Sequence, residues 1–183
     1  MILENAYEYK DYLGSVFDEL GFNGSFEIID NAIRLNIIVS ENQETWTKEQ
    51  VLEKVKEIML KKKKQELKDK INATCKEKII NGFRSEVLES VHAYDLTLED
   101  QANLQALVTA GDDSFFRCAE VVNGVLGNKT YKKHTKEQLL KLSREALKFK
   151  SDLILFYGRE KERLNAINSL EELEKFAIKE YLT

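Results

Sequence analysis

Apolar residues recur at helical spacing near the start of the chain and at strand spacing soon afterwards. Over 4–20, steps of three and four place one apolar face on a predicted helix, formed by Tyr9, Tyr12, Leu13, Val16, Phe17 and Leu20. Two strands are predicted over 26–29 and 33–39, joined by the turn Asp30-Asn31. The second strand alternates apolar and polar residues, so one of its faces is expected to be covered. Residues 1–46 are therefore predicted to form a small module of one helix and a β-hairpin.

A long helix is predicted over 47–81. Thr47 is its expected cap, with Gln50 as the second half of a capping box, and no Gly or Pro interrupts the helix before Gly82. The apolar stripe of this helix stops over 61–66. Its residues before and after that gap are Val51, Val55, Ile58, Met59, Leu67, Ile71, Cys75 and Ile79. A stripe that stops in mid-helix indicates two packing environments, so the helix is expected to connect two modules.

Four consecutive lysines, Lys61 to Lys64, lie in that gap. A run of basic residues can bind nucleic acid, but the chain carries a net charge of −4 and acidic residues follow the run closely. We therefore interpret the lysines as a solvated helix face and expect no nucleic-acid partner.

The rest of the chain, 82–183, is predicted to be a mainly helical domain with a β-hairpin. After an extended stretch over 83–94, Thr97 and Asp100 are expected to form a capping box for a short helix that ends at Gly111. The inner face of this helix is assigned to Leu104, Leu107 and Val108.

The hairpin is predicted from Asn123-Gly124, because both residues tolerate the positive φ that a tight hairpin turn requires. Apolar strands over 115–122 and 125–132 flank this turn. Gly127-Asn128 is a rival turn or a bulge.

A second long helix with a seven-residue repeat is predicted next, capped by Thr135 with Gln138 as its box partner. Steps of three and four connect the residues of its seam, which are Leu139, Leu142, Ala146, Phe149, Leu153 and Phe156. Such a seam can join chains into a trimer, or it can pack on the chain's own hairpin. We favour the second arrangement, because Phe149 and Phe156 are large for a narrow coiled-coil core.

The pattern as a whole predicts an α+β fold. A last helix is expected after the cap Ser169, with Glu172 as its box partner and Leu170, Leu173, Phe176 and Ala177 as its face. With 183 residues, 43% of them hydrophobic, the chain can build real cores. Its longest apolar runs are far below the ~18 residues of a membrane span, so neither a membrane association nor a signal peptide is expected. Cys75 and Cys118 are expected to remain thiols.

Candidates for chemistry are few. Cys75, Cys118, His92 and His134 could suggest a zinc site or a cysteine–histidine pair, but they form no Cys-x-x-Cys or His-x-x-x-His motif. Glycine-rich phosphate loops are absent. We therefore predict no catalytic, metal-binding or cofactor-binding residue and no enzymatic activity.

Gln101 lies one helical turn before Leu104, close to the face that the short helix must bury. A buried amide needs hydrogen-bond partners, and backbone groups of an irregular segment can supply them. The hypothesis is that Gln101 or Asn103 fixes the stretch over 83–94 against the short helix. The alternative is that both amides are exposed.

From Cys75 onward the chain carries an ordered series of motifs: Cys75-Lys-Glu-Lys-Ile79, Gly82-Phe83-Arg-Ser85, His92-Ala-Tyr94, Asp100-Gln101-Ala-Asn103-Leu104, Phe116-Arg-Cys118, His134-Thr135-Lys-Glu-Gln138-Leu139 and Ser169-Leu-Glu-Glu-Leu173. In order and spacing, the series resembles an uncharacterised domain of tail-fibre and tail-module proteins of tailed phages. Its signature residues here are His92, Tyr94, Asp100, Gln101, Asn103, Leu104, His134, Thr135 and Gln138. The chain departs from the family in the hairpin, where Leu126 or Tyr131 stands in place of the usual tryptophan.

The resemblance implies a structural component of a phage tail or phage-tail-like particle, at the baseplate or tail fibre, that acts by protein–protein binding. The alternative is a tail-fibre assembly chaperone that binds the fibre or receptor-binding protein, and a hydrolase or metal enzyme is a distant third. Tail-fibre or baseplate proteins are the implied partners, with further copies of the chain as a second option. The implied location is the host cytoplasm during assembly and then the particle. The family has no established catalytic residues, so none is carried over.

Overall fold

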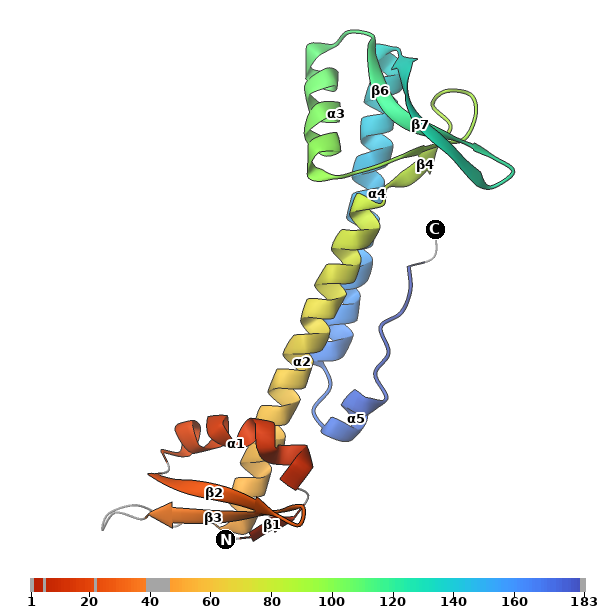
Figure 1. Cartoon of the computed structure of the whole chain (residues 1–183). Helices are drawn as coiled ribbons and strands as arrows, with labels where there is room; N and C mark the ends of the chain where they lie inside the picture. Colours follow the sequence, from red (N-terminus) through yellow and green to blue (C-terminus); the bar gives the residue numbers. More distant parts are fainter. Residues whose placement is uncertain (1, 5, 22, 39–46, 182–183) are drawn as a thin grey trace. The chain divides into compact units, whose positions relative to one another are not determined.

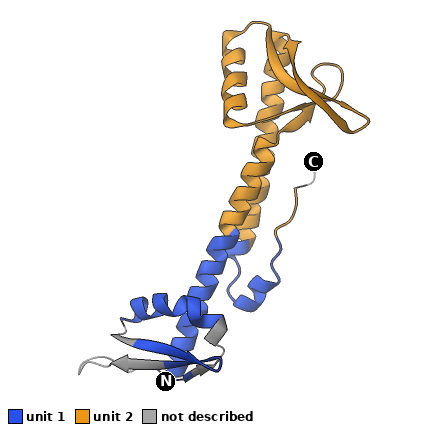
Figure 2. Cartoon of the chain, in the orientation of Figure 1, with its two compact units in different colours: residues 1–67, 164–177 blue, residues 68–163, 178–183 orange. Residues whose placement is uncertain are grey.

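The computed structural model describes residues 2–4, 6–21, 23–38 and 47–181. They belong to two compact units, residues 1–67 with 164–177 and residues 68–163 with 178–183 (Figure 2). Each unit combines helices with an antiparallel sheet (Figure 1), which confirms the predicted α+β class.

The predicted division into segments 1–46, 47–81 and 82–183 stays a prediction. Val39, the predicted end of the second strand, lies outside the described residues. Within the described ranges, no helix is both long and apolar enough to cross a membrane.

The first unit contains a three-stranded sheet in the order β1-β3-β2. Its elements are β1 (Ile2–Glu4), α1 (Ala6–Leu20), β2 (Asn23–Ile29), β3 (Ala32–Ile38), the first part of α2 (Lys48–Ile80) and α5 (Leu170–Glu174). The turn Asp30-Asn31 between β2 and β3 has φ values of 48° and 60°, the positive values that a two-residue hairpin needs. The predicted N-terminal hairpin is therefore confirmed.

The predicted start of the N-terminal helix at Glu4 is wrong. Ile2–Glu4 forms strand β1 instead, with Glu4 opposite Ala32 of β3. Pairing with β1 gives the backbone groups on the second side of β3 hydrogen-bond partners. These hydrogen bonds come from β3, about 30 residues later in the chain. The helical periodicity near Glu4 therefore could not predict them.

The core of the first unit lies between α1, β3 and α2. Its buried residues are Tyr9, Leu13, Val16, Ile33, Val51, Val55, Ile58 and Met59. Helix α2 begins as predicted, because Thr47 N–H donates to Gln50 Oε1 at 2.8 Å and Gln50 N–H donates to Thr47 Oγ1 at 3.3 Å. The first face predicted for the long helix is thus the face that packs on α1.

The interpretation of the lysine run as a solvated face holds only in part. Lys62 Nζ donates to Ser15 Oγ at 2.8 Å and lies 5.5 Å from the centre of the Tyr12 ring. Lys64 Nζ donates to the carbonyl oxygens of Asn165 and Ile167 at 2.9 and 2.7 Å. Because carbonyls at a helix end are unpaired and carry negative partial charge, an ammonium group stabilises them. Two of the four lysines therefore have structural roles.

The second unit contains a four-stranded antiparallel sheet in the order β4-β5-β6-β7. Its elements are the last part of α2, β4 (Phe83–Ser85), β5 (His92–Tyr94), α3 (Leu98–Ala110), β6 (Ser114–Val122), β7 (Val125–His134) and most of α4 (Lys136–Asn165). The predicted extended stretch is therefore two short paired strands with a turn between them.

The turn of the β6–β7 hairpin is Asn123-Gly124, as predicted, with φ values of 51° and 81°. Ala119 lies opposite Lys129, whereas Val121 lies opposite Leu126, so β7 contains one extra residue between these pairs. The extra residue falls at Gly127-Asn128. Of the two options for this dipeptide, the structure has the bulge.

Local capping signals place the ends of α3 and, in part, those of α5. Thr97 and Asp100 form the predicted reciprocal box at the start of α3, and Gly111 ends the helix with a φ of 74°. The box predicted for α5 is only half formed, because Glu172 Oε2 accepts from Asn168 N–H instead of the backbone of Ser169. Helix α5 also ends at Glu174, so its predicted continuation through 176–177 is wrong.

The seam of α4 packs mainly inside the chain. Leu139, Leu142 and Ala146 are buried in one cluster with Phe116 and Cys118 of β6. This is the arrangement that we favoured over a trimer seam. The sheet supplies the apolar surface that a partner chain would otherwise have to provide.

Candidate recognition surface

Tyr94 and His134 are two signature residues that the fold brings into direct contact. The two side chains are joined by a hydrogen bond of 3.0 Å between Tyr94 Oη and His134 Nε2, and His134 Nδ1 lies 2.9 Å from the carbonyl oxygen of Lys132. Because a carbonyl can only accept, Nδ1 carries the proton in neutral His134, and the Tyr94 hydroxyl donates to Nε2. Burial raises the pKa of Tyr94 and lowers the pKa of His134, so both stay neutral near pH 7. This pair is a structural link in the core.

His92 is fixed in a similar way. Its Nδ1 lies 2.9 Å from the carbonyl oxygen of Ser90, two residues earlier in the chain, and its ring is buried. Among the described residues, no three His, Cys, Asp or Glu side chains come close enough together to hold a metal ion. The two histidines of the signature therefore support strand ends.

Gln138 connects the start of α4 to the turn between β4 and β5. Its Oε1 accepts from Thr135 N–H at 2.9 Å, which completes the predicted box, and its Nε2 donates to the carbonyl oxygen of Val87 at 2.9 Å. At the end of β4, next to this turn, the buried Ser85 hydroxyl donates to Glu145 of α4 at 2.5 Å. The signature residue Gln138 thus holds the turn over 86–91 against α4.

Gln101 does form a hydrogen bond that fixes an irregular segment, as hypothesised, but the segment is a different one. Gln101 Nε2 donates to the carbonyl oxygen of Leu96 at 2.8 Å, and Gln101 Oε1 accepts from Lys150 Nζ at 2.6 Å. The amide thus fixes the residue before α3, outside the stretch over 83–94, and it also joins α3 to α4. Asn103 is exposed and makes no such contact in the described structure. Leu104, the apolar member of the signature, is buried in the core as predicted.

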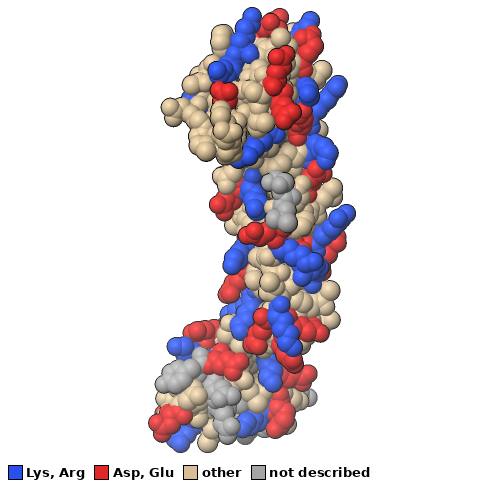
Figure 3. Space-filling model, turned by 90° about the vertical axis from the view of Figure 1, so that its right-hand side faces the viewer, with Lys and Arg blue, Asp and Glu red and all other residues tan. Residues whose placement is uncertain are grey.

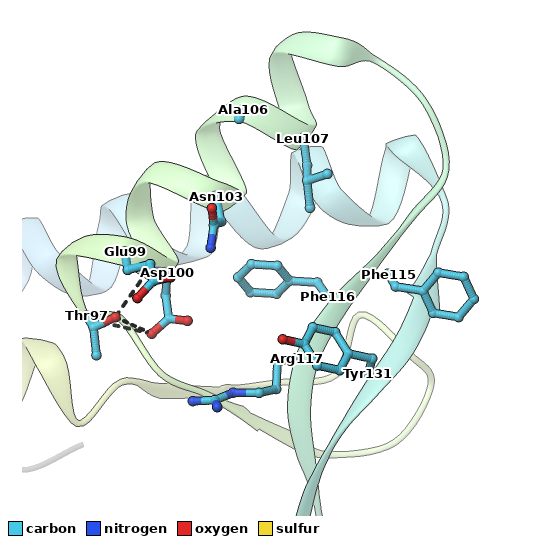
Figure 4. Close-up of a pocket in the computed structure, with 10 residues that line it drawn as sticks. All are labelled: Thr97, Glu99, Asp100, Asn103, Ala106, Leu107, Phe115, Phe116, Arg117 and Tyr131. Carbon is cyan, nitrogen blue, oxygen red and sulfur yellow. Dashed lines mark hydrogen bonds between the residues drawn. The ribbon is translucent and has the colours of Figure 1, made fainter.

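An open groove lies beside this framework, between α3 and the β6–β7 hairpin (Figure 4). It has a volume of about 430 Å³. Its lining residues from α3 and the cap before it are Thr97, Glu99, Asp100, Asn103, Ala106 and Leu107. The strands contribute Phe115, Phe116, Arg117 and Tyr131. Three signature-region polar residues, Thr97, Asp100 and Asn103, thus come together on one wall.

The opposite wall of the groove is aromatic. Phe115 and Tyr131 are 61% and 69% exposed, which is unusual for residues of their size. Phe116 points toward α3 in Figure 4, and its ring stacks on Tyr94 with a centroid distance of 6.3 Å. The aromatic wall therefore has one ring held in the core and two rings in contact with solvent.

Asp95 forms ion pairs with two basic residues near the groove. Its carboxylate accepts from Arg117 at 3.2 Å and from Lys129 at 2.7 Å. Because Asp95 precedes the cap of α3, these ion pairs position the guanidinium of Arg117 beside the groove. Away from such pairs, acidic and basic side chains are interspersed on the face shown in Figure 3.

The sequence did not identify the aromatic wall in advance. Phe115 and Phe116 are adjacent on a strand, so one of them must face away from the core, but the pattern does not say which. Tyr131 was noted only as a replacement for a tryptophan. Arg117 was noted only as part of the motif Phe116-Arg-Cys118, and its ion pair could not be expected because Asp95 is 22 residues away.

The groove has the chemistry of a binding surface. Its lining combines the rings of Phe115, Phe116 and Tyr131 with polar and charged side chains from α3 and β6. Exposed aromatic rings beside a few polar and charged groups are typical of surfaces that recognise another protein. The arrangement can therefore bind a side chain or a short segment of a partner.

Comparison with known proteins identifies a family for this chain. A family model described as "Domain of unknown function (DUF4376)" matches residues 62–179, well over half of the chain. No curated protein and no solved structure matches.

Proposed function

The chain belongs to the DUF4376 family, and we propose that it is a non-enzymatic structural component of a phage tail or phage-tail-like particle, located at the baseplate or tail fibre. The proposal rests on the resemblance of its ordered motifs to tail-fibre and tail-module proteins. Tail-fibre or baseplate proteins are its partners in this proposal. It is made in the host cytoplasm and then built into the particle.

The observation that carries a binding role is the groove with its exposed aromatic wall. Phe115 and Tyr131 together offer two large rings to a partner, and aromatic residues are enriched among the residues that dominate binding energy. The buried pair Tyr94–His134 joins β5 to β7, the strand that carries Tyr131 of the groove wall. A surface that is fixed before binding loses less entropy when the partner docks.

A second candidate function is a tail-fibre assembly chaperone that binds the fibre or receptor-binding protein. The observation that favours it is that each unit has its own buried core formed within a single chain. A protein that must leave the mature particle needs such a fold, because it has to remain stable without its partner.

The test is the protein composition of purified tail particles from the phage or cell that encodes this chain. Presence in a fixed ratio to the fibre or baseplate proteins supports the structural role. Absence from particles, together with co-purification of free fibre protein, supports the chaperone. Absence from particles and from fibre complexes would overturn both.

Variants of the groove make the test specific. The double variant Phe115→Ser/Tyr131→Ser removes both exposed rings, and we expect at least about a tenfold loss of retained fibre or baseplate protein in co-purification. Val125→Ser is the matched control, because Val125 is 70% exposed on the same hairpin and does not line the groove. Equal retention by both variants would show that the groove is not the binding surface.

A further inference from the structure

Helix α4 has a second apolar stripe on its solvent side. Leu140, Leu147 and Ile154 are 41%, 66% and 51% exposed, and each is seven residues from the next. Two turns of an α-helix contain about seven residues, so the three side chains lie almost in line along α4. Seven-residue spacing is the repeat of a helix that packs lengthwise on another helix.

Small residues alternate with the large ones along this stripe. Ser143, Ser151 and Gly158 lie between or beyond the three large side chains on the same side of the helix. Open space surrounds the Cα of Gly158, where an added Cβ would meet no heavy atom within 4 Å. Alternating large and small side chains form knobs and gaps, and such a surface suits the interdigitating side chains of a partner helix.

A shallow groove between α3 and α4 adjoins the stripe. It has a volume of about 120 Å³, and its lining includes Leu147 and Ser143 from α4 and Leu104 and Gln105 from α3. A helix that packs on the stripe would therefore contact α3 along one side. The occupant has two elements to lie against, which a flat helix surface would not offer.

Between Leu140 and Ile154, the charges beside the stripe are basic. Arg144 and Lys148 lie on one side of it and Lys150 on the other, whereas the nearest acidic residues of this stretch, Glu145 and Asp152, lie further round the helix. Lys148 pairs with Asp152 but keeps 76% of its side chain exposed. A second copy of α4 would bring these like charges together, and an acidic helix would pair with them.

We propose that the exposed stripe of α4 is a docking site for an acidic amphipathic helix of a partner protein. The partner helix presents apolar residues at seven-residue spacing to Leu140, Leu147 and Ile154, and its glutamates or aspartates lie beside Arg144 and Lys148. This inference rests on the stripe and its charges alone. It holds or fails independently of the phage-tail proposal.

A pair of synthetic peptides tests it. The first is a fluorescein-labelled helix of about four heptads with Leu at positions a and d and Glu at e and g, and the second carries Lys in place of every Glu. Fluorescence anisotropy with the full chain at low salt measures both affinities. We expect the acidic peptide to bind at least about tenfold more tightly than the basic one, with the ratio shrinking as salt is added.

Variants locate the binding. Leu147→Glu is expected to weaken the acidic peptide at least about tenfold, and Arg144→Glu/Lys148→Glu is expected to reverse the preference between the peptides. Val125→Glu is the control, because Val125 is similarly exposed but lies at the start of β7. Circular dichroism checks that each variant is folded, and if Leu147→Glu unfolds the chain, the charge-reversal variant decides.

Three outcomes would overturn the proposal. They are equal affinity for the two peptides, no binding of either, and binding that Leu147→Glu and the charge reversal leave unchanged. Light scattering tests whether a second copy of the chain occupies the stripe instead. A dimer of the wild-type chain that Leu147→Glu dissolves would assign the stripe to a second copy of the chain and refute the acidic partner.

Discussion

Gln138 is the residue through which a local helix cap also fixes a distant turn. The substitution Gln138→Leu keeps the size of the side chain and removes both of its hydrogen bonds, to Thr135 N–H and to the carbonyl oxygen of Val87. The chain offers a matched control. Gln50→Leu breaks an equivalent Thr-x-x-Gln box at the start of α2, where Gln50 is exposed.

The two substitutions should differ by the cost of one buried carbonyl group. Loss of the box contributes about 1 kcal/mol at either site. Val87 is only 5% exposed, so its carbonyl group loses a partner that water replaces poorly, at a cost of about 1–3 kcal/mol. We therefore expect Gln138→Leu to cost about 2–4 kcal/mol and Gln50→Leu about 1 kcal/mol.

Because the two glutamines lie in different compact units, the assay must resolve segments of the chain. Native-state hydrogen exchange read by peptide mass spectrometry does so. In Gln138→Leu, amides over 86–91 and in the first turn of α4 should exchange much faster. In Gln50→Leu, the change should be confined to the first turn of α2. Equal losses of stability for the two variants, or unchanged exchange over 86–91, would refute the bridging role of Gln138.

Three further predictions concern single residues. Burial lowers the pKa of His134, so below the unfolded-state pKa near 6.5 the unfolded state binds more protons than the folded state. Unfolding midpoints should therefore decrease as the pH is lowered, and His134→Gln should weaken this dependence between pH 7.5 and 5.5. Gly82→Ala should cost more than about 3 kcal/mol in denaturant unfolding, because φ is +79° and a Cβ would lie 1.8 Å from the carbonyl oxygen of Tyr94. Burial opposes the charge of Glu160, but hydrogen bonds from Lys179 N–H and Arg163 outweigh burial and lower the pKa of Glu160. Glu160→Gln should therefore speed hydrogen exchange of the Lys179 amide above pH 5. The difference in exchange rate between variant and wild type should vanish as acid protonates Glu160.

Sequence reasoning succeeded where the cause of a structure lies within a few residues. The boxes at Thr47, Thr97 and Thr135 each join residues three apart, and the turn at Asn123-Gly124 depends on two adjacent residues that tolerate positive φ. Such signals are complete within one window of the chain. They placed the starts of three helices and the main hairpin.

It failed where the cause lies far along the chain. Strand β1 is three residues long, and only pairing with β3 makes it a strand. No local pattern marks Glu160 as a buried carboxylate, yet it is only 3% exposed, and its partner Lys179 N–H lies 19 residues later in the chain. The second bond of Gln138 spans 51 residues. No local pattern contains these partners.

Helix α4 explains why the sequence could not assign its own binding surface. Its apolar residues come in adjacent pairs at seven-residue intervals, Leu139-Leu140, Ala146-Leu147 and Leu153-Ile154. Both members of each pair have the same periodicity, so periodicity alone cannot say which one enters the core. The sheet settles the choice, because Phe116 and Cys118 of β6 cover the first members of the first two pairs. The second members, Leu140, Leu147 and Ile154, are left on the solvent side, where they form an apolar row along the helix. One row of the seven-residue repeat thus packs in the core, and the other row is exposed and can bind a partner.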